Sequence, residues 1–270
     1  MQTFRREFLK LLPTAAAIFS GPLGGAAAAE PGNERTRSAP RGMDPKNVRA
    51  LAFDAYGTLF DVHSVVALGE ELFPGQGNAL SNTWRLKQLQ YTWARTLMGR
   101  YEDFWKVTED GLVFAAKSLK LDLDADKRNR LMESYLSLAA FPDVAQGLKE
   151  LSGAGYPLAI LSNGTPKMLR AAARSAGIEG NFAHIISVDE IKIYKPSPRV
   201  YELAPAKFKL PAAAIGFVSS NSWDVAGAAS FGLTTFWINR GAQPIDELGF
   251  PPARTVAKLT ELLPELKRGA

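Results

Sequence analysis

An apolar run that ends at an acid is the feature of this sequence that most constrains the fold. Residues 48–53 are apolar except for Arg49, as is typical of a buried parallel strand, and Asp54 follows directly. Gly57 and Thr58 then provide a turn. Because open α/β sheets bind ligands at the carboxyl ends of their strands, Asp54 is a candidate functional carboxylate. A lone acid at such a place is also a common turn former, so position alone leaves its role open.

The rest of the chain changes from helical periodicity to an alternation of strands and helices. The pattern predicts four helices first, at residues 65–72, 79–98, 101–119 and 125–138, with Asp124 capping the last. It then predicts strands at 156–161, 183–187, 214–218 and 234–238. The intervening helices are expected at 143–153 (capped by Asp143), from the turn at 162–165 to 177, at 197–207 and at 222–231. Strands that alternate with helices imply crossover connections and a mostly parallel sheet.

The expected fold class is therefore α/β, with a Rossmann-like, mostly parallel sheet core and an inserted helical cap subdomain. The core is predicted to comprise residues 46–61 and 140–270, and the cap residues 62–139. The first strand ends where the cap begins. We therefore expect the cap to cover the edge of the sheet that carries Asp54.

The amino terminus is interpreted as an export signal. Residues 4–10, FRREFLK, resemble a twin-arginine signal, and a weakly apolar run leads to three alanines at 27–29. Residues 1–29 are thus expected to be a signal peptide that is cleaved near Ala29, and residues 30–45 a flexible linker. The resemblance implies passage through the twin-arginine export machinery and a periplasmic location. The apolar run is too short for stable membrane insertion, which needs about 20 residues.

Composition is that of an ordinary globular protein, with 46% hydrophobic and 22% charged residues. A formal net charge of +5 without a basic run gives no support for nucleic-acid binding. The chain has no cysteine, which excludes disulfides, metal thiolates and a cysteine nucleophile.

Residues 53–61, FDAYGTLFD, resemble the first motif of the haloacid dehalogenase superfamily, in which the first Asp is a covalent nucleophile. Within that superfamily, this segment resembles the L-2-haloacid dehalogenase branch. The segments WRLKQLQYTW from Trp84 and LMGRYEDFW from Leu97 resemble the same branch. Superfamily phosphatases carry a second acid two residues after the nucleophile, whereas Tyr56 stands here. A halide leaves without a proton, so the missing acid favours cleavage of a carbon–halogen bond.

The resemblance implies a role for each matching position. Asp54 attacks the carbon, Thr58 and Lys195 support its carboxylate, and Arg85 receives the halide. The substrate carboxylate is assigned to Ser162 and Asn163, with backbone groups near Tyr56. The turn 162–164 lies between a strand and a helix, where hydroxyl and N–H groups form an anion-binding site.

The fourth motif carries the hydrolytic step in the same family. By resemblance, Asp224 activates the attacking water, Ser219 and Asn221 position that water and Asp54, and Tyr201 adds a further hydrogen bond. Phosphatases have an acidic pair in this motif to hold magnesium, but Ser220 stands at the first acidic position. We therefore expect no metal and no other cofactor.

An apolar wall should surround the small alkyl group of the substrate. Its candidate members, together with the residue beside the nucleophile, are Tyr56, Leu89, Phe104, Trp223 and Ala55. Leu86 stands where dehalogenases commonly have Gln, and Ala55 is smaller than the Leu of several members, so both positions bear on substrate preference. His63 and His184 show no triad pattern and receive no catalytic role.

These expectations lead to one reaction and two alternatives. The chain is expected to convert (S)-2-haloacids into (R)-2-hydroxyacids with inversion, through a covalent ester on Asp54. The alternatives are a magnesium-dependent phosphatase of the same superfamily and an exported binding module without turnover. The expected partners are a small 2-haloalkanoate and the export machinery. A homodimer is a family expectation.

Overall fold

A parallel six-stranded sheet lies at the centre of the computed structural model, which describes residues 44–268. The strand order is β3-β2-β1-β4-β5-β6, and every neighbouring pair is parallel. The strands are β1 (Ala50–Phe53), β2 (Leu158–Ser162), β3 (His184–Ser187), β4 (Ile215–Ser219), β5 (Thr234–Ile238) and β6 (Arg254–Val256). Every residue of β1, β2, β4 and β5 is buried, which explains their continuous apolar runs.

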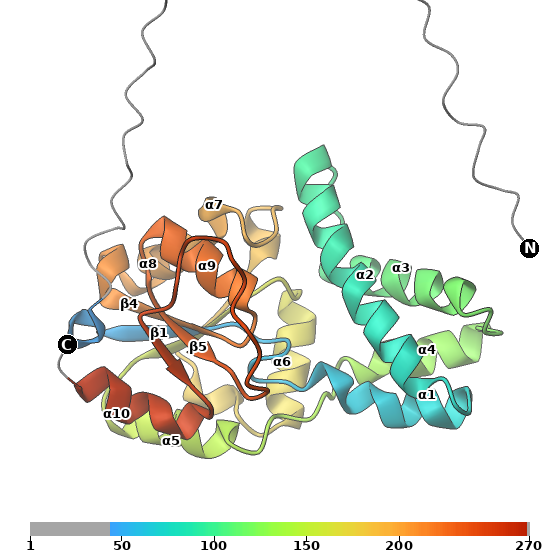
Figure 1. Cartoon of the computed structure of the whole chain (residues 1–270), viewed down its shortest axis with the longest axis horizontal. Helices are drawn as coiled ribbons and strands as arrows, with labels where there is room; N and C mark the ends of the chain where they lie inside the picture. Colours follow the sequence, from blue (N-terminus) through green and yellow to red (C-terminus); the bar gives the residue numbers. More distant parts are fainter. Residues whose placement is uncertain (1–43, 269–270) are drawn as a thin grey trace, which may run out of the picture. The chain divides into compact units, whose positions relative to one another are not determined.

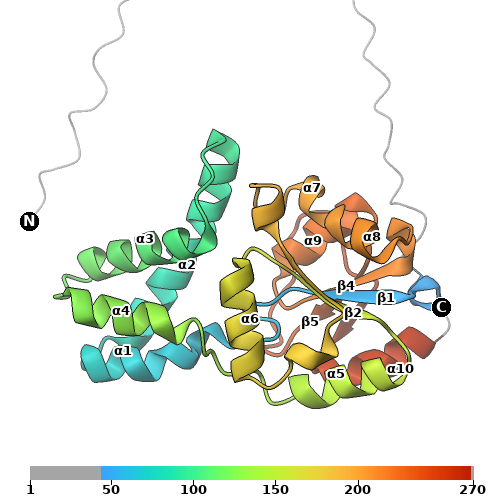
Figure 2. The same ribbon diagram turned by 180° about the vertical axis from the view of Figure 1, so that it is seen from behind.

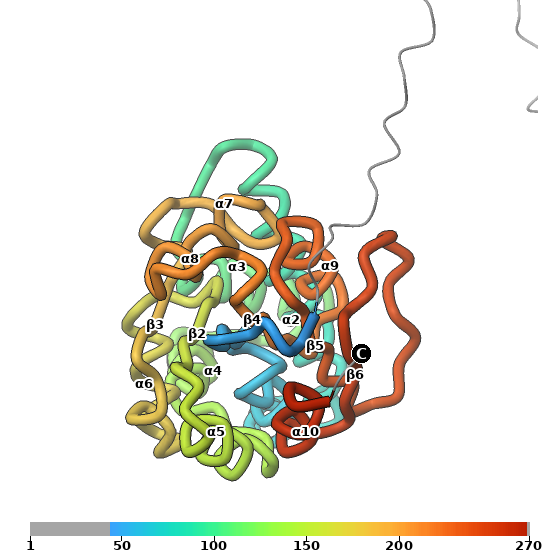
Figure 3. The backbone as a smooth tube through the Cα atoms, turned by 90° about the vertical axis from the view of Figure 1, so that its left-hand side faces the viewer, coloured from blue at the N-terminus to red at the C-terminus, as the bar shows by residue number. Residues whose placement is uncertain are grey.

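Helices cover both faces of this sheet (Figures 1 and 3). One face carries α5 (Val144–Gly153), α6 (Pro166–Ser175) and α10 (Leu262–Lys267), and the other carries α7 (Pro198–Tyr201), α8 (Leu203–Phe208) and α9 (Ser222–Phe231). The chain leaves β1 in one direction toward β2 and β3 and returns to β4 on its other side. Such a reversal of strand order places a crevice at the carboxyl ends of the central strands, directly after Phe53.

Five α-helices lie between β1 and β2, of which α5 covers one face of the sheet and the other four form the insertion. The inserted helices are α1 (Val66–Leu72), α2 (Gly77–Met98), α3 (Phe104–Ser118) and α4 (Ala125–Ser134). Figures 1 and 2 show them gathered beyond the end of β1 that leads to Asp54. The long pair α2 and α3 is joined by a buried hydrogen bond from Trp84 Nε1 to the Thr108 carbonyl (2.7 Å). The predicted class, a Rossmann-like parallel core with inserted helices, is confirmed.

Several predicted boundaries were wrong by a few residues. The helix expected at 101–119 begins only at Phe104, because the Asp103 carboxylate caps it by accepting from Lys106 N (2.8 Å). The helix expected at 125–138 ends at Ser134, whose hydroxyl bonds back to the Leu131 carbonyl (2.6 Å). Asp143 is the N-cap residue of α5, but its side chain does not cap the helix, because Arg240 and Leu259 N occupy its oxygens.

The helix expected at 197–207 is divided into α7 and α8. Pro205 has no N–H to donate to the Tyr201 carbonyl four residues earlier, so one continuous helix cannot pass through this point. β6 and α10, which follow the last predicted strand, were not predicted from the sequence. Shorter 3₁₀ turns lie at Pro45–Asn47, Val62–Val65, Glu179–Asn181, Val188–Glu190, Ala212–Ala214 and Leu259–Glu261.

The predicted signal peptide at residues 1–29 lies outside the described residues, as does the predicted linker except for Asp44 and Pro45. Between residues 44 and 268, none of the helices combines the length and the apolar character that crossing a bilayer requires.

Candidate active site

Asp54 follows β1 directly, and its buried carboxylate accepts hydrogen bonds on both oxygens. Oδ1 accepts from Lys195 Nζ (3.0 Å). Oδ2 accepts from Thr58 Oγ1 (2.9 Å) and from Asn221 Nδ2 (2.9 Å). The carboxylate is thus held in one orientation by a cation and two neutral donors, as a preorganised nucleophile requires.

Lys195 lies between two buried carboxylates. Its ammonium group contacts Asp54 Oδ1 and Asp224 Oδ2 (2.9 Å), and lies over the Phe217 ring, 4.8 Å from its centroid. Burial would lower the pKa of Lys195, but Asp224 and Asp54 together raise it above its usual value. The amine therefore stays charged and balances one of the two acids.

Asp224 lies in the first turn of α9 and is fully buried. Besides Lys195, it accepts from Tyr201 Oη (2.6 Å) and Ser219 Oγ (3.2 Å). Burial raises the pKa of Asp224 to about 6, although Lys195 acts in the opposite direction. A carboxylate with this pKa can accept a proton near neutral pH. A Cβ at Gly227 would lie 2.6 Å from Tyr201 Oη, so only glycine leaves room for this hydroxyl.

A chain of hydrogen bonds joins the fourth motif, residues 218–224, to the nucleophile loop, the segment 54–60 that follows β1. Ser220 N donates to Thr58 Oγ1 (2.8 Å), which in turn donates to Asp54. Asn221 N donates to Ser219 Oγ (3.1 Å), and its side-chain amide donates to both Asp54 and the Tyr56 carbonyl (3.2 Å). The carboxyl ends of β1 and β4 are therefore coupled through these side chains.

Arg85 extends from α2 onto the loop that follows Asp54. Its Nη2 donates to the Tyr56 carbonyl (3.1 Å) and its Nη1 to Gln88 Oε1 (2.7 Å). Burial lowers the pKa of Arg85, while Tyr135 and Asp54 raise it, but a guanidinium keeps its charge in proteins. A fixed cation from the inserted helices is thus held next to the carboxylate of the core.

The two residues predicted to bind the substrate carboxylate lie at the carboxyl end of β2, where Ser162 is the last residue of the strand and Asn163 follows it. Asn163 Oδ1 accepts from Lys195 N (3.1 Å), and within residues 44–268 its amide nitrogen has no hydrogen-bond partner. Ser162 Oγ accepts from Gly164 N (3.2 Å), which leaves the hydroxyl proton available. A Cβ at Gly164 would lie 2.7 Å from the Tyr56 ring, so the absence of a side chain lets this turn pack on the nucleophile loop.

Only some of the residues predicted to form the apolar wall contact one another. The Tyr56 and Phe104 rings are buried and 5.3 Å apart, and Tyr56 also packs on Tyr135 (6.1 Å). Trp223 instead packs edge to face on Trp93 of α2 (5.4 Å). Leu89 is half-buried one turn after Arg85, and Ala55 is fully buried under the Asp54 turn. The substrate contacts of these residues stay predictions.

Leu86 and the histidines lie away from this cluster. Leu86 is 53% exposed, so its side chain does not replace a buried polar group of the site. His63 is exposed and its ring lies 3.4 Å from Ser81 Oγ, whereas His184 packs on Phe208 at the opposite end of its strand. Neither position favours a catalytic histidine.

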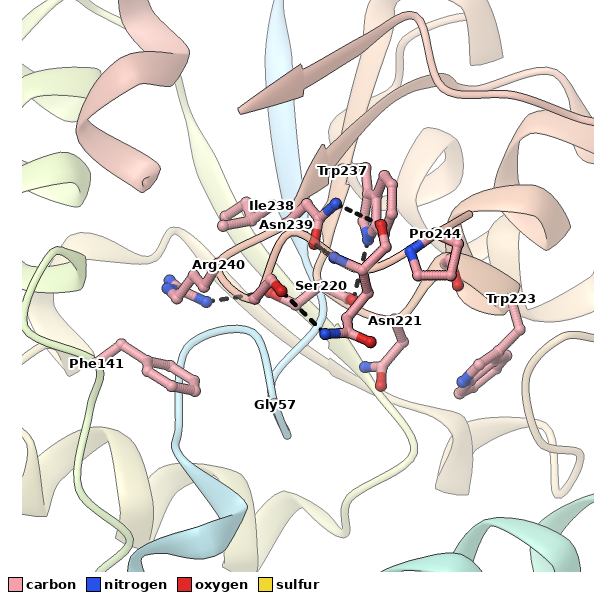
Figure 4. Close-up of a pocket in the computed structure, with 13 residues that line it drawn as sticks. Gly57, Phe141, Ser220, Asn221, Trp223, Trp237, Ile238, Asn239, Arg240 and Pro244 are labelled. Carbon is pink, nitrogen blue, oxygen red and sulfur yellow. Dashed lines mark hydrogen bonds between the residues drawn. The ribbon is translucent and has the colours of Figure 1, made fainter. Parts of the chain in front are cut away.

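A pocket of about 320 Å³ opens beside Gly57 and Asn221 (Figure 4). Arg240 lies in its wall, where its Nη1 donates to Ser220 Oγ (3.0 Å) and its other nitrogens form a two-pronged pair with Asp143 (3.1 and 3.0 Å). The sequence reading missed Arg240, although its place shortly after β5 is the signal that identified Asp54 after β1. It also missed Gln88, which is three residues from Arg85 on the same helix face.

Among the described residues, no three His, Cys, Asp or Glu side chains gather as a metal site. The carboxylate oxygens of Asp54 and the neighbouring Tyr56 carbonyl oxygen accept hydrogen bonds from N–H and O–H donors. Such donors, two of them cationic, are the opposite of what a divalent ion needs. The chemistry of this donor set does not fit a magnesium ion.

Comparison with known proteins identifies the relatives of this chain. Residues 48–232 match the model of the haloacid dehalogenase-like hydrolases. The chain is 50% identical over 212 residues to an (S)-2-haloacid dehalogenase from Pseudomonas sp. strain YL, covering 78% of this chain and 91% of that protein. A structure of L-2-haloacid dehalogenase from Xanthobacter autotrophicus with chloropropionic acid covalently bound is 38% identical, with a TM-score of 0.78 and coverage of 82% and 99%. An (S)-2-haloacid dehalogenase from Pseudomonas putida is 45% identical over 80% of this chain and 96% of its own length.

Proposed function

Because the chain belongs to the haloacid dehalogenase-like hydrolases, we propose that it hydrolyses (S)-2-haloalkanoates to (R)-2-hydroxyalkanoates through a covalent ester on Asp54. The observation that carries this proposal is the placement of the Asp54 carboxylate among Lys195, Thr58 and Asn221, with the Arg85 guanidinium on the adjoining Tyr56 carbonyl. A nucleophile and a cation for the departing anion are thereby held side by side.

In the first step, an oxygen of Asp54 attacks C2 of the substrate from the side opposite the halogen. The new C–O bond inverts the carbon, and the halide leaves with the electrons of the C–X bond toward Arg85. At about 4 Å and an effective dielectric near 20, one cation attracts the departing anion by about 4 kcal/mol. Ser162 and Asn163 hold the substrate carboxylate, because the hydroxyl proton and the free amide nitrogen are available at the carboxyl end of β2.

In the second step, water attacks the carbonyl carbon of the Asp54 ester and passes a proton to Asp224. The bond between that carbon and the substrate oxygen breaks, and the departing alkoxide takes up the proton from Asp224 to become the hydroxyl group of the product. The product therefore retains an oxygen that came from Asp54. Asp224 can serve as the base because burial raises its pKa to about 6. Ser219 and Asn221, which connect Asp224 to Asp54, position the water, and Tyr201 orients Asp224.

The donor set at Asp54 favours this reaction over magnesium-dependent phosphate transfer. Tyr56 stands where a phosphatase has its second acid, and its buried ring offers no carboxylate to protonate a leaving oxygen. Ser220 has no carboxylate to bind a metal ion, and its Oγ accepts a hydrogen bond from the Arg240 guanidinium. We therefore propose a metal-independent hydrolase.

Halide release from the two enantiomers of 2-chloropropionate tests the proposed function. The (S) enantiomer should release chloride and yield (R)-lactate, and a strong chelator should leave the rate unchanged, because the charges around Asp54 come from side chains. A noncatalytic binding module would release no chloride from either enantiomer. Release that chelation abolishes and magnesium restores would contradict the metal-independent scheme.

We further propose that the enzyme is exported to the periplasm. The paired Arg5 and Arg6, the weakly apolar run and the alanines at 27–29 support this proposal. Expression of the full chain followed by fractionation should yield a shortened protein in the periplasm, and changing both arginines to lysine should retain it inside the cell. Periplasmic delivery that does not depend on these arginines would contradict the proposed route.

We also propose a homodimer that uses the surface of α2. Leu97 and Met98 expose 87% and 63% of their surface at the end of this helix, and Leu86 lies three turns earlier on the same side. Analytical ultracentrifugation should give a species of twice the chain mass, which Leu97→Glu converts to the monomer. A monomeric wild-type protein would contradict this assembly.

A further inference from the structure

Gln88 is a fully buried polar residue that the reaction scheme above does not use. It lies on α2 three residues after Arg85, so the two side chains share a helix face. Its Oε1 accepts from Arg85 Nη1 (2.7 Å), and its Nε2 donates to Thr108 Oγ1 of α3 (2.7 Å). Gln88 thus connects the cation of the site to the neighbouring helix.

The hydrogen bonds around Gln88 fix the direction in which its amide points. Thr108 Oγ1 gives its proton to the Phe104 carbonyl (2.6 Å), so toward Gln88 it can only accept. The NH₂ group of Gln88 must therefore face Thr108, and the carbonyl oxygen must face Arg85. Since Phe104 begins α3 and its ring packs on Tyr56, the same network anchors Arg85 relative to the nucleophile loop.

Gln88 is an uncharged partner, and this matters for how Arg85 can stabilise the departing halide. Both terminal nitrogens of the Arg85 guanidinium donate to carbonyl oxygens. Nη1 donates to the side-chain carbonyl of Gln88, and Nη2 donates to the backbone carbonyl of Tyr56. Neither acceptor carries a formal charge, so the guanidinium is oriented while its positive charge remains available to a departing anion. A carboxylate at position 88 would orient the same group but would offset its charge in a buried, low-dielectric environment.

We propose that Gln88 is a positioning residue for Arg85, which holds the guanidinium beside the departing halide without neutralising it. This inference rests on the proposed dehalogenation. Gln88 itself does not touch the substrate. Its contribution should appear only in the step in which the carbon–halogen bond breaks, because hydrolysis of the Asp54 ester involves no halide.

Gln88→Glu tests this inference, with Gln90→Glu as the matched control. Gln90 is exposed on the same helix and accepts from Lys87, so its change adds the same charge away from the site. Rapid-quench mass spectrometry of the Asp54 peptide should show ester formation from (S)-2-chloropropionate slowed by about tenfold or more in Gln88→Glu, as for loss of a preorganised transition-state contact. Ester hydrolysis should keep the wild-type rate, and Gln90→Glu should leave both steps unchanged.

The bromo substrate separates a positioning role from a merely structural one. Bromide is the better leaving group and needs less charge stabilisation, so Gln88→Glu should raise the ratio of the bromo to the chloro rate. Gln88→Met, which keeps the side-chain length but removes the acceptor, should also slow ester formation while Arg85 stays charged. An unchanged ratio, or an equal slowing of both steps with a lowered Tm, would overturn the inference. Absence of halide release by the wild-type protein would overturn the proposed function and this inference together.

Discussion

Lys195 is the residue on which the charge balance of the site depends. Its ammonium group lies within 3.0 Å of Asp54 and 2.9 Å of Asp224, and all three side chains are buried. Two carboxylates in such a place repel each other and are poorly solvated, so both depend on this cation. The same contact serves folding and chemistry, because a carboxylate attacks carbon only when it is ionised.

Replacing Lys195 with methionine should therefore damage both stability and activity. Removing one partner from a buried ion cluster costs about 3–5 kcal/mol of unfolding free energy, because charge is left without compensation. Ester formation should fall by on the order of 10²–10³-fold. Urea unfolding and rapid-quench measurements check the two effects.

The matched control is Lys192→Met. Lys192 is 61% exposed and pairs with Asp189 at 3.1 Å, so its loss should change the unfolding free energy by about 1 kcal/mol or less. An equal loss of unfolding free energy in the two variants would show that Lys195 does not compensate the buried charges of Asp54 and Asp224.

The protonation of Asp224 should set the acid limb of the pH profile. Water is activated only by the ionised form, so the rate of ester hydrolysis should rise with pH through about 6, the pKa of this buried carboxyl. Tyr201 donates to the charged form and so lowers this pKa; Tyr201→Phe should move the limb to higher pH. Single-turnover rates between about pH 5 and 8 measure the shift. A limb that stays in place, or moves to lower pH, would contradict Asp224 as the base.

At the scale of secondary structure, the sequence predicted the strands better than the helix ends. β1, β2, β4 and β5 are buried on both faces, so their apolar runs stand out, and Asp54, Ser162 and Ser219 lie at the carboxyl ends of β1, β2 and β4. Helix ends depend on single local contacts, such as the Asp103 cap of α3 and the missing N–H of Pro205. β6 has only three residues, one of them exposed, and such a short edge strand has no clear pattern.

Side chains that act through other side chains were harder to foresee than those that end a strand. Asp54 follows β1 directly and Ser162 ends the neighbouring strand β2, so their proximity follows from the parallel sheet. Gln88 and Arg240 become visible only when α2 packs on α3 and the chain after β5 turns back to Asp143. Their places in the sequence, three residues after Arg85 and shortly after β5, make them candidates, but their contacts with Thr108 and Asp143 are tertiary and cannot be read from any spacing.

The connection between α2 and α3 also contacts the segment that carries Lys195. Tyr101 Oη donates to Asp189 Oδ1 (2.5 Å), its ring stacks on Tyr194 (5.0 Å), and Tyr194 Oη donates to the Glu102 carbonyl (2.6 Å). Lys195 follows Tyr194 directly. The inserted helices are thereby tied to the loop of the core that places the cation, and not only to the nucleophile loop through Arg85.

At the scale of the whole described molecule, the site is assembled from both parts of the fold. The carboxyl ends of β1, β2 and β4 provide Asp54, Ser162 and Ser219, while α2 provides Arg85. In the proposed reaction, the core supplies the nucleophile Asp54 after β1 and the base Asp224 from α9, and the inserted helices supply Arg85 for the leaving anion. This division explains why the insertion follows the first strand: its first residues continue directly from the nucleophile loop.

The central claim is that Asp54, and not water, forms the first bond to the substrate carbon. A single turnover of (S)-2-chloropropionate by excess unlabelled enzyme in ¹⁸O-labelled water tests it most directly, with the label located by mass spectrometry. We expect the hydroxyl oxygen of the lactate to be unlabelled and the label to be found in the Asp54 peptide. Labelled lactate from this first turnover, with an unlabelled Asp54 peptide, would show direct attack by water and rule out the covalent ester.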